Sequence, residues 1–84
     1  MLDMRNTLDM MLSNDYKVRV KAEYLQTKIR YEKLHKMITK YEAGTLAFTS
    51  TCPIHLLRAQ KRYMGEYLHC LEIRAEIEKI DLED

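Results

Sequence analysis

The sequence has no long hydrophobic run. None of its 84 residues belongs to a stretch of about 18 consecutive apolar residues, the length that a transmembrane helix requires. The first twelve residues, MLDMRNTLDMML, are interrupted by charges and therefore do not have the pattern of a secretory signal. Charge of one sign is also lacking, because the net charge is only +1, too balanced for a strong non-specific binder of nucleic acid. We expect a cytoplasmic protein that does not insert into a membrane.

Cysteine and the usual ligand-binding motifs are scarce. Cys70 lies on the second predicted helix and Cys52 directly precedes that helix, roughly 26 Å away at 1.5 Å rise per residue, so the two cannot form a disulfide within a chain. Free thiols are typical of a reducing cytoplasm. The histidines, His35, His55 and His69, have none of the spacings of metal sites, and no glycine-rich phosphate loop is present. We expect no metal, no cofactor and no enzymatic activity.

The sequence does contain helical periodicity. Residues 15–43 and 53–82 are two stretches of similar length in which apolar residues recur every three or four positions, the spacing of one helix face. This spacing predicts two long helices that pack along these main apolar lines. The main lines consist of Val20, Tyr24, Thr27, Tyr31, Leu34, Ile38 and Tyr41 in the first stretch, and of Leu57, Met64, Leu68, Leu71, Ala75 and Leu82 in the second.

Residues 44–52 are predicted to form the turn between the two helices. Gly44 stands where a left-handed residue ends a helix at low cost. Pro53 suits the first turn of a new helix, where its missing N–H is not needed. The helices are therefore expected to be antiparallel, and equal distances from the turn would place Tyr24 near Ala75.

Residues 1–12 are predicted to form a short additional helix, separated from the hairpin by the cap-forming residues 13–15. A hairpin of two helices, each roughly 43 Å long, has no enclosed interior and needs a third layer. We therefore predict a single all-α domain over residues 1–84, in which a short N-terminal helix precedes a long antiparallel helical hairpin completed by oligomerisation. The residues expected to share one face of the short helix are Met1, Met4, Leu8 and Met11.

Each long helix has a second apolar line on its other face, at the end away from the turn. If four large aliphatic side chains stayed exposed, the fold would lose about 1.5 to 3 kcal/mol of hydrophobic stabilisation for each of them. A ten-residue segment is too short to cover both lines by itself, so we predict that the N-terminal segment covers part of them and that a homo-oligomer covers the rest. The alternative is that residues 1–12 fold over both lines and complete a monomeric three-helix bundle. The predicted interface consists of Val18, Ala22, Leu25 and Ile29 in the first helix and Cys70, Ile73, Ile77 and Ile80 in the second.

The charges are segregated along the chain. Cations outnumber acids in the first helix, whereas residues 72–84 are mostly acidic and lie beside its start in the predicted hairpin. At the turn, acids do not balance the bases, and Tyr41 or Tyr63 would be close enough to stack on a nucleobase. The alternative is an ordinary solvated helix surface. The predicted anion-binding patch consists of Lys36, Lys40, Arg58, Lys61 and Arg62.

The stretch from Tyr31 to Leu82 contains the segments KLHKM, KYEAGTL, TCPI, YL and LEIRAEIE. In these segments the chain resembles a group of short, uncharacterised proteins encoded by phages and prophages of Gram-positive bacteria. The first 30 residues lie outside the resemblance. It implies an accessory protein that acts in the cytoplasm of a bacterial host by binding a host or phage protein, and it brings no catalytic or ligand-binding residue with it.

Two functions are compatible with these patterns. The first is a non-enzymatic, oligomeric protein-interaction module that inhibits a host enzyme or a defence system through surface complementarity. The second is a nucleotide or nucleic-acid binder, such as a helical sponge for signalling nucleotides, that uses the basic patch. A nucleotide binder would be stabilised against heat by its ligand and would lose binding as salt increases, whereas an interaction module would capture a protein from a host lysate.

Overall fold

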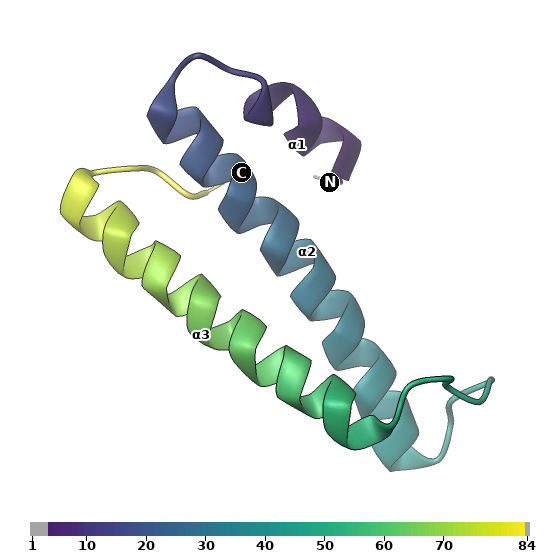
Figure 1. Cartoon of the computed structure of the whole chain (residues 1–84). Helices are drawn as coiled ribbons and strands as arrows, with labels where there is room; N and C mark the ends of the chain where they lie inside the picture. Colours follow the sequence, from purple (N-terminus) through teal and green to yellow (C-terminus); the bar gives the residue numbers. More distant parts are fainter. Residues whose placement is uncertain (1–3, 84) are drawn as a thin grey trace.

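The computed structural model describes residues 4–83, with side chains from Thr7 onward, and in this range the chain is all helical. Helix α1 (Met4–Met11) precedes two long helices, α2 (Tyr16–Ala43) and α3 (Ile54–Glu78), which lie side by side as an antiparallel hairpin (Figure 1). This confirms the predicted fold class. None of the helices in the described range is both long enough and apolar enough to cross a membrane.

The ends of α2 follow the sequence signals. Asp15 has an extended backbone, and its carboxylate accepts a hydrogen bond of 2.9 Å from the backbone N–H of Lys17. This bond satisfies an amide that has no partner within the helix. Gly44 ends α2 in a left-handed conformation, with φ at 76°, and its N–H points back to the carbonyls of the last turn.

The end of α3 differs from the prediction. The helix ends at Glu78 rather than at Leu82, because Lys79 adopts a left-handed conformation with φ at 57°. The N–H of Ile80 then donates to the carbonyl of Ala75 at 2.8 Å. Such a hydrogen bond is typical of a helix C-terminus that ends in a left-handed residue. The last described residues consequently turn back toward α2, and Ile80 is buried there (Figure 1).

Helix α1 packs along the first half of α2, but not through the predicted apolar face. Thr7 is fully buried and Met10 packs against the core, whereas Leu8 is 56% exposed. The predicted face was therefore wrong at Leu8 and at Met11, which is 38% exposed. Thr7 and Met10 lie one helical turn apart and therefore share one face of α1. Met1 and the Met4 side chain lie outside the described part of the chain.

The register of the hairpin is about one helical turn from the predicted one. Tyr24 packs against Leu68 and Leu71 rather than level with Ala75. The Tyr24 hydroxyl donates to the Glu72 carboxylate at 2.8 Å, and this partly buried bond joins the two helices in the observed register. The spacing of apolar residues repeats at every turn, so it is compatible with several registers that differ by one helical turn. Contacts between specific polar side chains distinguish these registers.

Candidate functional site

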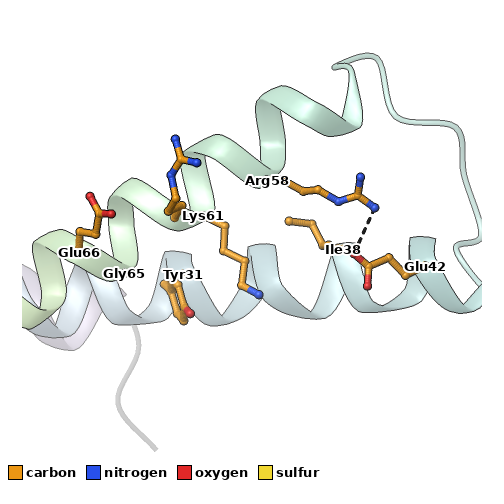
Figure 2. A pocket seen from close by; sticks show the side chains of 8 residues that line it. Tyr31, Ile38, Glu42, Arg58, Lys61, Gly65 and Glu66 are labelled. Atoms are coloured by element: carbon orange, nitrogen blue, oxygen red, sulfur yellow. Dashed lines mark hydrogen bonds and ion pairs between the residues drawn. The ribbon is translucent and has the colours of Figure 1, made fainter.

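An open groove of about 570 Å³ lies between α2 and α3 in the half of the hairpin nearer the loop (Figure 2). This volume is within the range of small-ligand sites. We call it the cationic groove. Its lining residues are Tyr31, Ile38 and Glu42 from α2 and Arg58, Lys61, Arg62, Gly65 and Glu66 from α3.

The floor of the cationic groove is formed by Tyr31 against the backbone of α3. A Cβ atom added at Gly65 would lie 3.3 Å from Cε2 of Tyr31, closer than ordinary van der Waals contact. A glycine inside a helix costs about 1 kcal/mol relative to alanine, and here it makes room for the ring. The ring of His35, one turn along α2, stacks on Tyr31 with 6.5 Å between ring centroids. Tyr31 is therefore held in place by its neighbours.

Two cations reach across the groove. The Lys61 ammonium lies 5.9 Å from the centroid of the Tyr31 ring, and in Figure 2 it extends toward α2 between Tyr31 and Ile38. Arg58 forms an ion pair with Glu42 at 3.2 Å, and the two side chains are 49% and 56% exposed. So exposed a pair contributes only about 0 to 1 kcal/mol. An anionic ligand can therefore replace Glu42 as the partner of Arg58 at little cost.

Arg62 also lines the groove, and its guanidinium lies on the ring of the next residue, Tyr63. Its guanidinium carbon lies 4.9 Å from the centroid of the Tyr63 ring, and Nη2 donates to the Tyr63 hydroxyl at 3.1 Å. With Arg62 included, three cations and the carboxylates of Glu42 and Glu66 line the groove, which leaves an excess of one positive charge. This excess favours a small anion.

The structure divides the predicted anion-binding patch. Arg58, Lys61 and Arg62 line one groove, but Lys36 and Lys40 are not among its lining residues. Each of these two lysines is two positions from the buried Ile38, so at 100° per residue both project from the opposite side of α2. They are exposed and belong to a different surface.

The aromatic residue of the groove is Tyr31, and not Tyr41 or Tyr63 as the sequence predicts. Tyr41 lines a separate hollow beside the loop, and Tyr63 supports Arg62. The spacing of Tyr31 predicts only that it belongs to the main apolar line. The one signal in the sequence was Gly65, a glycine inside a predicted helix, because such a glycine indicates a close approach of another group.

Two hydrogen bonds between tyrosine and glutamate connect α2 with α3. Burial raises the pKa of Tyr24 to about 12, and the hydrogen bond to Glu72 and its negative charge add to this effect. Burial also raises the pKa of Tyr67, whose hydroxyl donates to Glu23 at 3.2 Å. Both phenols therefore stay protonated at neutral pH and act as donors that hold the hairpin together.

The predicted oligomer interface is also divided. On α2 the second apolar line is largely covered within the same chain, because α1 packs along this half of the helix. Ile80 is buried by the reversal at Lys79. Of these positions, Ala22, Leu25 and Ile80 are buried, so another copy could reach them only if the covering segments moved. The buried or half-buried members are Val18, Ala22, Leu25, Ile29 and Ile80, and the exposed members are Cys70, Ile73 and Ile77.

A comparison with protein families gives one match. The family model described as Sequestin matches residues 14–77, which include all of α2 and nearly all of α3. The match therefore covers every residue that lines the cationic groove. No curated protein and no solved structure matches the chain significantly.

Proposed function

We propose that this protein, which belongs to the Sequestin family, is a non-enzymatic binding protein that holds a nucleotide in the cationic groove. The observation that supports this proposal is the presence of Tyr31 beside Arg58 and Lys61 in one open groove. Arginine and lysine bind phosphate through charge-assisted hydrogen bonds. A base stacked on an aromatic ring gains about 1 to 3 kcal/mol. The groove thus combines the two interactions that a nucleotide needs.

In the proposed complex the ligand replaces weak contacts that already exist within the groove. The ligand phosphate takes the place of the Glu42 carboxylate at Arg58, which exchanges one exposed ion pair for a charge-assisted contact. Lys61, now above the Tyr31 ring, approaches the same phosphate. The base then stacks on the ring that Lys61 uncovers. No rearrangement of the two helices is required.

A nucleotide fits the groove better than a nucleic-acid strand does. A polynucleotide requires a basic stripe that follows many phosphates, whereas the excess charge of the groove is one and Lys36 and Lys40 face elsewhere. We propose binding without turnover, because the groove is open to solvent. Catalysis of phosphoryl transfer relies on positioned groups in a site that excludes water. A protein with these properties sequesters its ligand, as a sponge does.

The test is calorimetric titration with ATP, supported by thermal unfolding with and without ATP. We expect ATP to raise the melting temperature and its affinity to decrease with salt. Replacement of Arg58 and Arg62 together by Glu should abolish binding. The matched control replaces Lys36 and Lys40 by Glu, the same change of charge on the opposite side of α2, and should retain binding. Equal losses in the two variants, or no binding of nucleotides by the wild type, would refute the proposal.

The second candidate function is the interaction module predicted from the sequence, which inhibits a host enzyme or a defence system in the host cytoplasm. The resemblance to phage and prophage proteins supports this setting for both candidates. The observation that favours a protein partner is the exposure of Ile73 and Ile77, at 47% and 74%. Capture of a host protein that is lost in Ile77→Asp and retained in Arg58→Glu would favour this second candidate.

A further inference from the structure

The open face of the Tyr31 ring is turned along α2. The Lys61 ammonium lies over this face, 5.9 Å from the ring centroid, and extends toward α2 on the side of Tyr31 that is nearer Ile38 (Figure 2). Gly65 approaches Tyr31 from the other side, where an added Cβ atom would lie only 3.3 Å from the ring. A base can therefore reach the ring only on the side that Lys61 covers.

A second ring lies on that same side. His35 follows Tyr31 by one helical turn in the direction of Ile38. The two rings are parallel, with 6° between their planes and 6.5 Å between their centroids. Four residues advance a helix by about 6 Å, so most of this separation runs along α2. The faces of Tyr31 and His35 are therefore turned toward each other across a narrow slot.

The width of the slot suits one planar ring. Carbon atoms in contact are about 3.5 Å apart, so a base in contact with both rings needs about 7 Å between them. The separation of 6.5 Å is close to this value, and a small rotation of one side chain supplies the rest. His35 is exposed, and within the described part of the chain its imidazole has no hydrogen bond that would oppose such a rotation. The hydroxyl of Thr39 donates to the backbone carbonyl of His35 and leaves the ring free.

We infer that His35 is the second wall of the base-binding site, so that the base of the nucleotide lies between the rings of Tyr31 and His35. This inference rests on the proposed function of the cationic groove and adds a residue that borders the groove without lining it. The phosphate contacts lie at the same level, because Lys61 extends into the interval between Tyr31 and Ile38 that contains His35 (Figure 2). The base and the phosphate of one nucleotide thus occupy neighbouring places.

Enclosure of the base also indicates the class of nucleotide. A base between two rings is in contact on both faces, so its stacking surface contributes twice. Purines have two fused rings, whereas pyrimidines have one. We therefore expect the site to prefer purine to pyrimidine nucleotides that carry the same phosphates. Pyrophosphate, which has no base, should bind without any contribution from His35.

The contrasting role for His35 is purely structural. Aromatic side chains four residues apart also contribute to helix stability alone. In that case, replacement of His35 would lower the melting temperature and leave the affinity for ATP unchanged. A wall of the base-binding site has the opposite signature. The melting temperature stays nearly constant, because the side chain is exposed, and the affinity decreases only for ligands that carry a base.

The first test is calorimetric titration of the full chain with ATP and, separately, with pyrophosphate. We expect His35→Ala to weaken ATP binding about tenfold, a typical loss for one contact between a base and an aromatic ring. Pyrophosphate binding and the melting temperature should not change. His35→Phe should restore most of the affinity for ATP, because it replaces the ring. His55→Ala is the matched control: His55 is exposed on α3 and does not line the groove, so this variant should bind as the wild type does.

The second test is fluorescence titration with 2-aminopurine riboside triphosphate, whose emission is quenched when its base stacks. At saturation, quenching should be strongest in the wild type and weaker in both His35→Ala and Tyr31→Leu. Wild-type ATP affinity and quenching in His35→Ala, or equal losses of ATP and pyrophosphate binding in that variant, would overturn the inference and leave the proposed function intact. Absence of nucleotide binding by the wild type would overturn both.

Discussion

The two ends of the hairpin are built differently. At the open end, α1 and the reversed C-terminal segment complete a core in which Leu25, Leu71 and Ala75 are at most 5% exposed. At the loop end, the buried apolar side chains among the described residues are only Ile38 and Leu57. The cationic groove lies at the loop end, beside Ile38.

This difference follows from the number of layers. Three elements enclose an interior from which water is excluded, whereas two helices alone leave a gap that water can enter. Charged side chains are tolerated in such a gap because they remain solvated. The open end therefore supplies most of the stability, and the loop end is free to supply binding. Substitutions at the open end should lower the free energy of unfolding, while substitutions in the groove should change affinity.

The largest expected effect is at Leu25, which is 5% exposed. Leu25→Asp buries a carboxylate without a partner and should lower the free energy of unfolding by more than about 3 kcal/mol, measured by urea denaturation. Leu12→Asp is the control, because Leu12 is 75% exposed and the change should stay within about 0.5 kcal/mol. Similar stability of the two variants would mean that α1 does not cover α2.

The next effect concerns Tyr24. Tyr24→Phe removes a hydrogen bond to a carboxylate and should cost about 1.5 to 3 kcal/mol at neutral pH. The folded structure raises the pKa of Tyr24 from its ordinary value of 10.0, which we take for the unfolded chain, to about 12. The resulting stabilisation is complete below pH 10 and is lost as the pH rises toward 12, because the unfolded chain releases the proton first.

The melting temperature of the wild type should therefore fall across that alkaline interval, and the fall should be smaller in Tyr24→Phe. Tyr41→Phe changes an exposed tyrosine at the loop end and should show the full wild-type fall. If Tyr24→Phe and the wild type lose stability equally between pH 10 and 12, the bond between Tyr24 and Glu72 does not hold the hairpin.

A smaller effect, on affinity, is expected at Gly65. Gly65→Ala gains about 1 kcal/mol of helix propensity, which the 3.3 Å contact with Tyr31 offsets, so stability should change by less than about 1 kcal/mol. The displaced ring should weaken ATP binding about tenfold, which corresponds to about 1.4 kcal/mol. Calorimetry measures the change, and Tyr31→Leu should reproduce it. Undiminished ATP affinity in both variants would exclude Tyr31 as the stacking surface.

The smallest effect is expected at Glu42. Glu42→Gln removes the carboxylate that competes for Arg58 and should strengthen ATP binding about threefold, with a stability change below about 1 kcal/mol. Glu32→Gln neutralises the same charge on α2 at a position that does not line the groove, and it serves as the control. A weaker affinity in Glu42→Gln would show that Glu42 contacts the ligand instead of competing with it.

Much of the fold was predictable because its signals are local. Asp15 and Gly44 mark the ends of α2, and the three- and four-residue spacing identified both long helices. The contacts of α1 were not predictable, since an eight-residue helix offers several faces and tertiary packing selected Thr7 and Met10. The left-handed Lys79 has no sequence signal either, because this conformation is unfavourable for lysine and persists through its surroundings.

The site was predictable only in part, for the same reason. The positions of Arg58 and Arg62 in the sequence place them near the turn. Which tyrosine of α2 lies opposite them depends on the register of the hairpin. In the observed register Tyr24 bonds to Glu72, a contact that the spacing of apolar residues does not specify. The sequence therefore indicated the charge of the groove and missed its aromatic floor at Tyr31.

The central claim is that the loop end of the hairpin binds a nucleotide. Its most direct test is a titration of the 15N-labelled protein with ATP, followed by amide chemical shifts in NMR spectra, with inorganic pyrophosphate in parallel. We predict saturable shifts at Tyr31, Lys61 and Gly65, larger with ATP than with pyrophosphate because only ATP carries a base that can stack. Shifts confined to the open end, or spectra unchanged at millimolar ATP, would contradict the account.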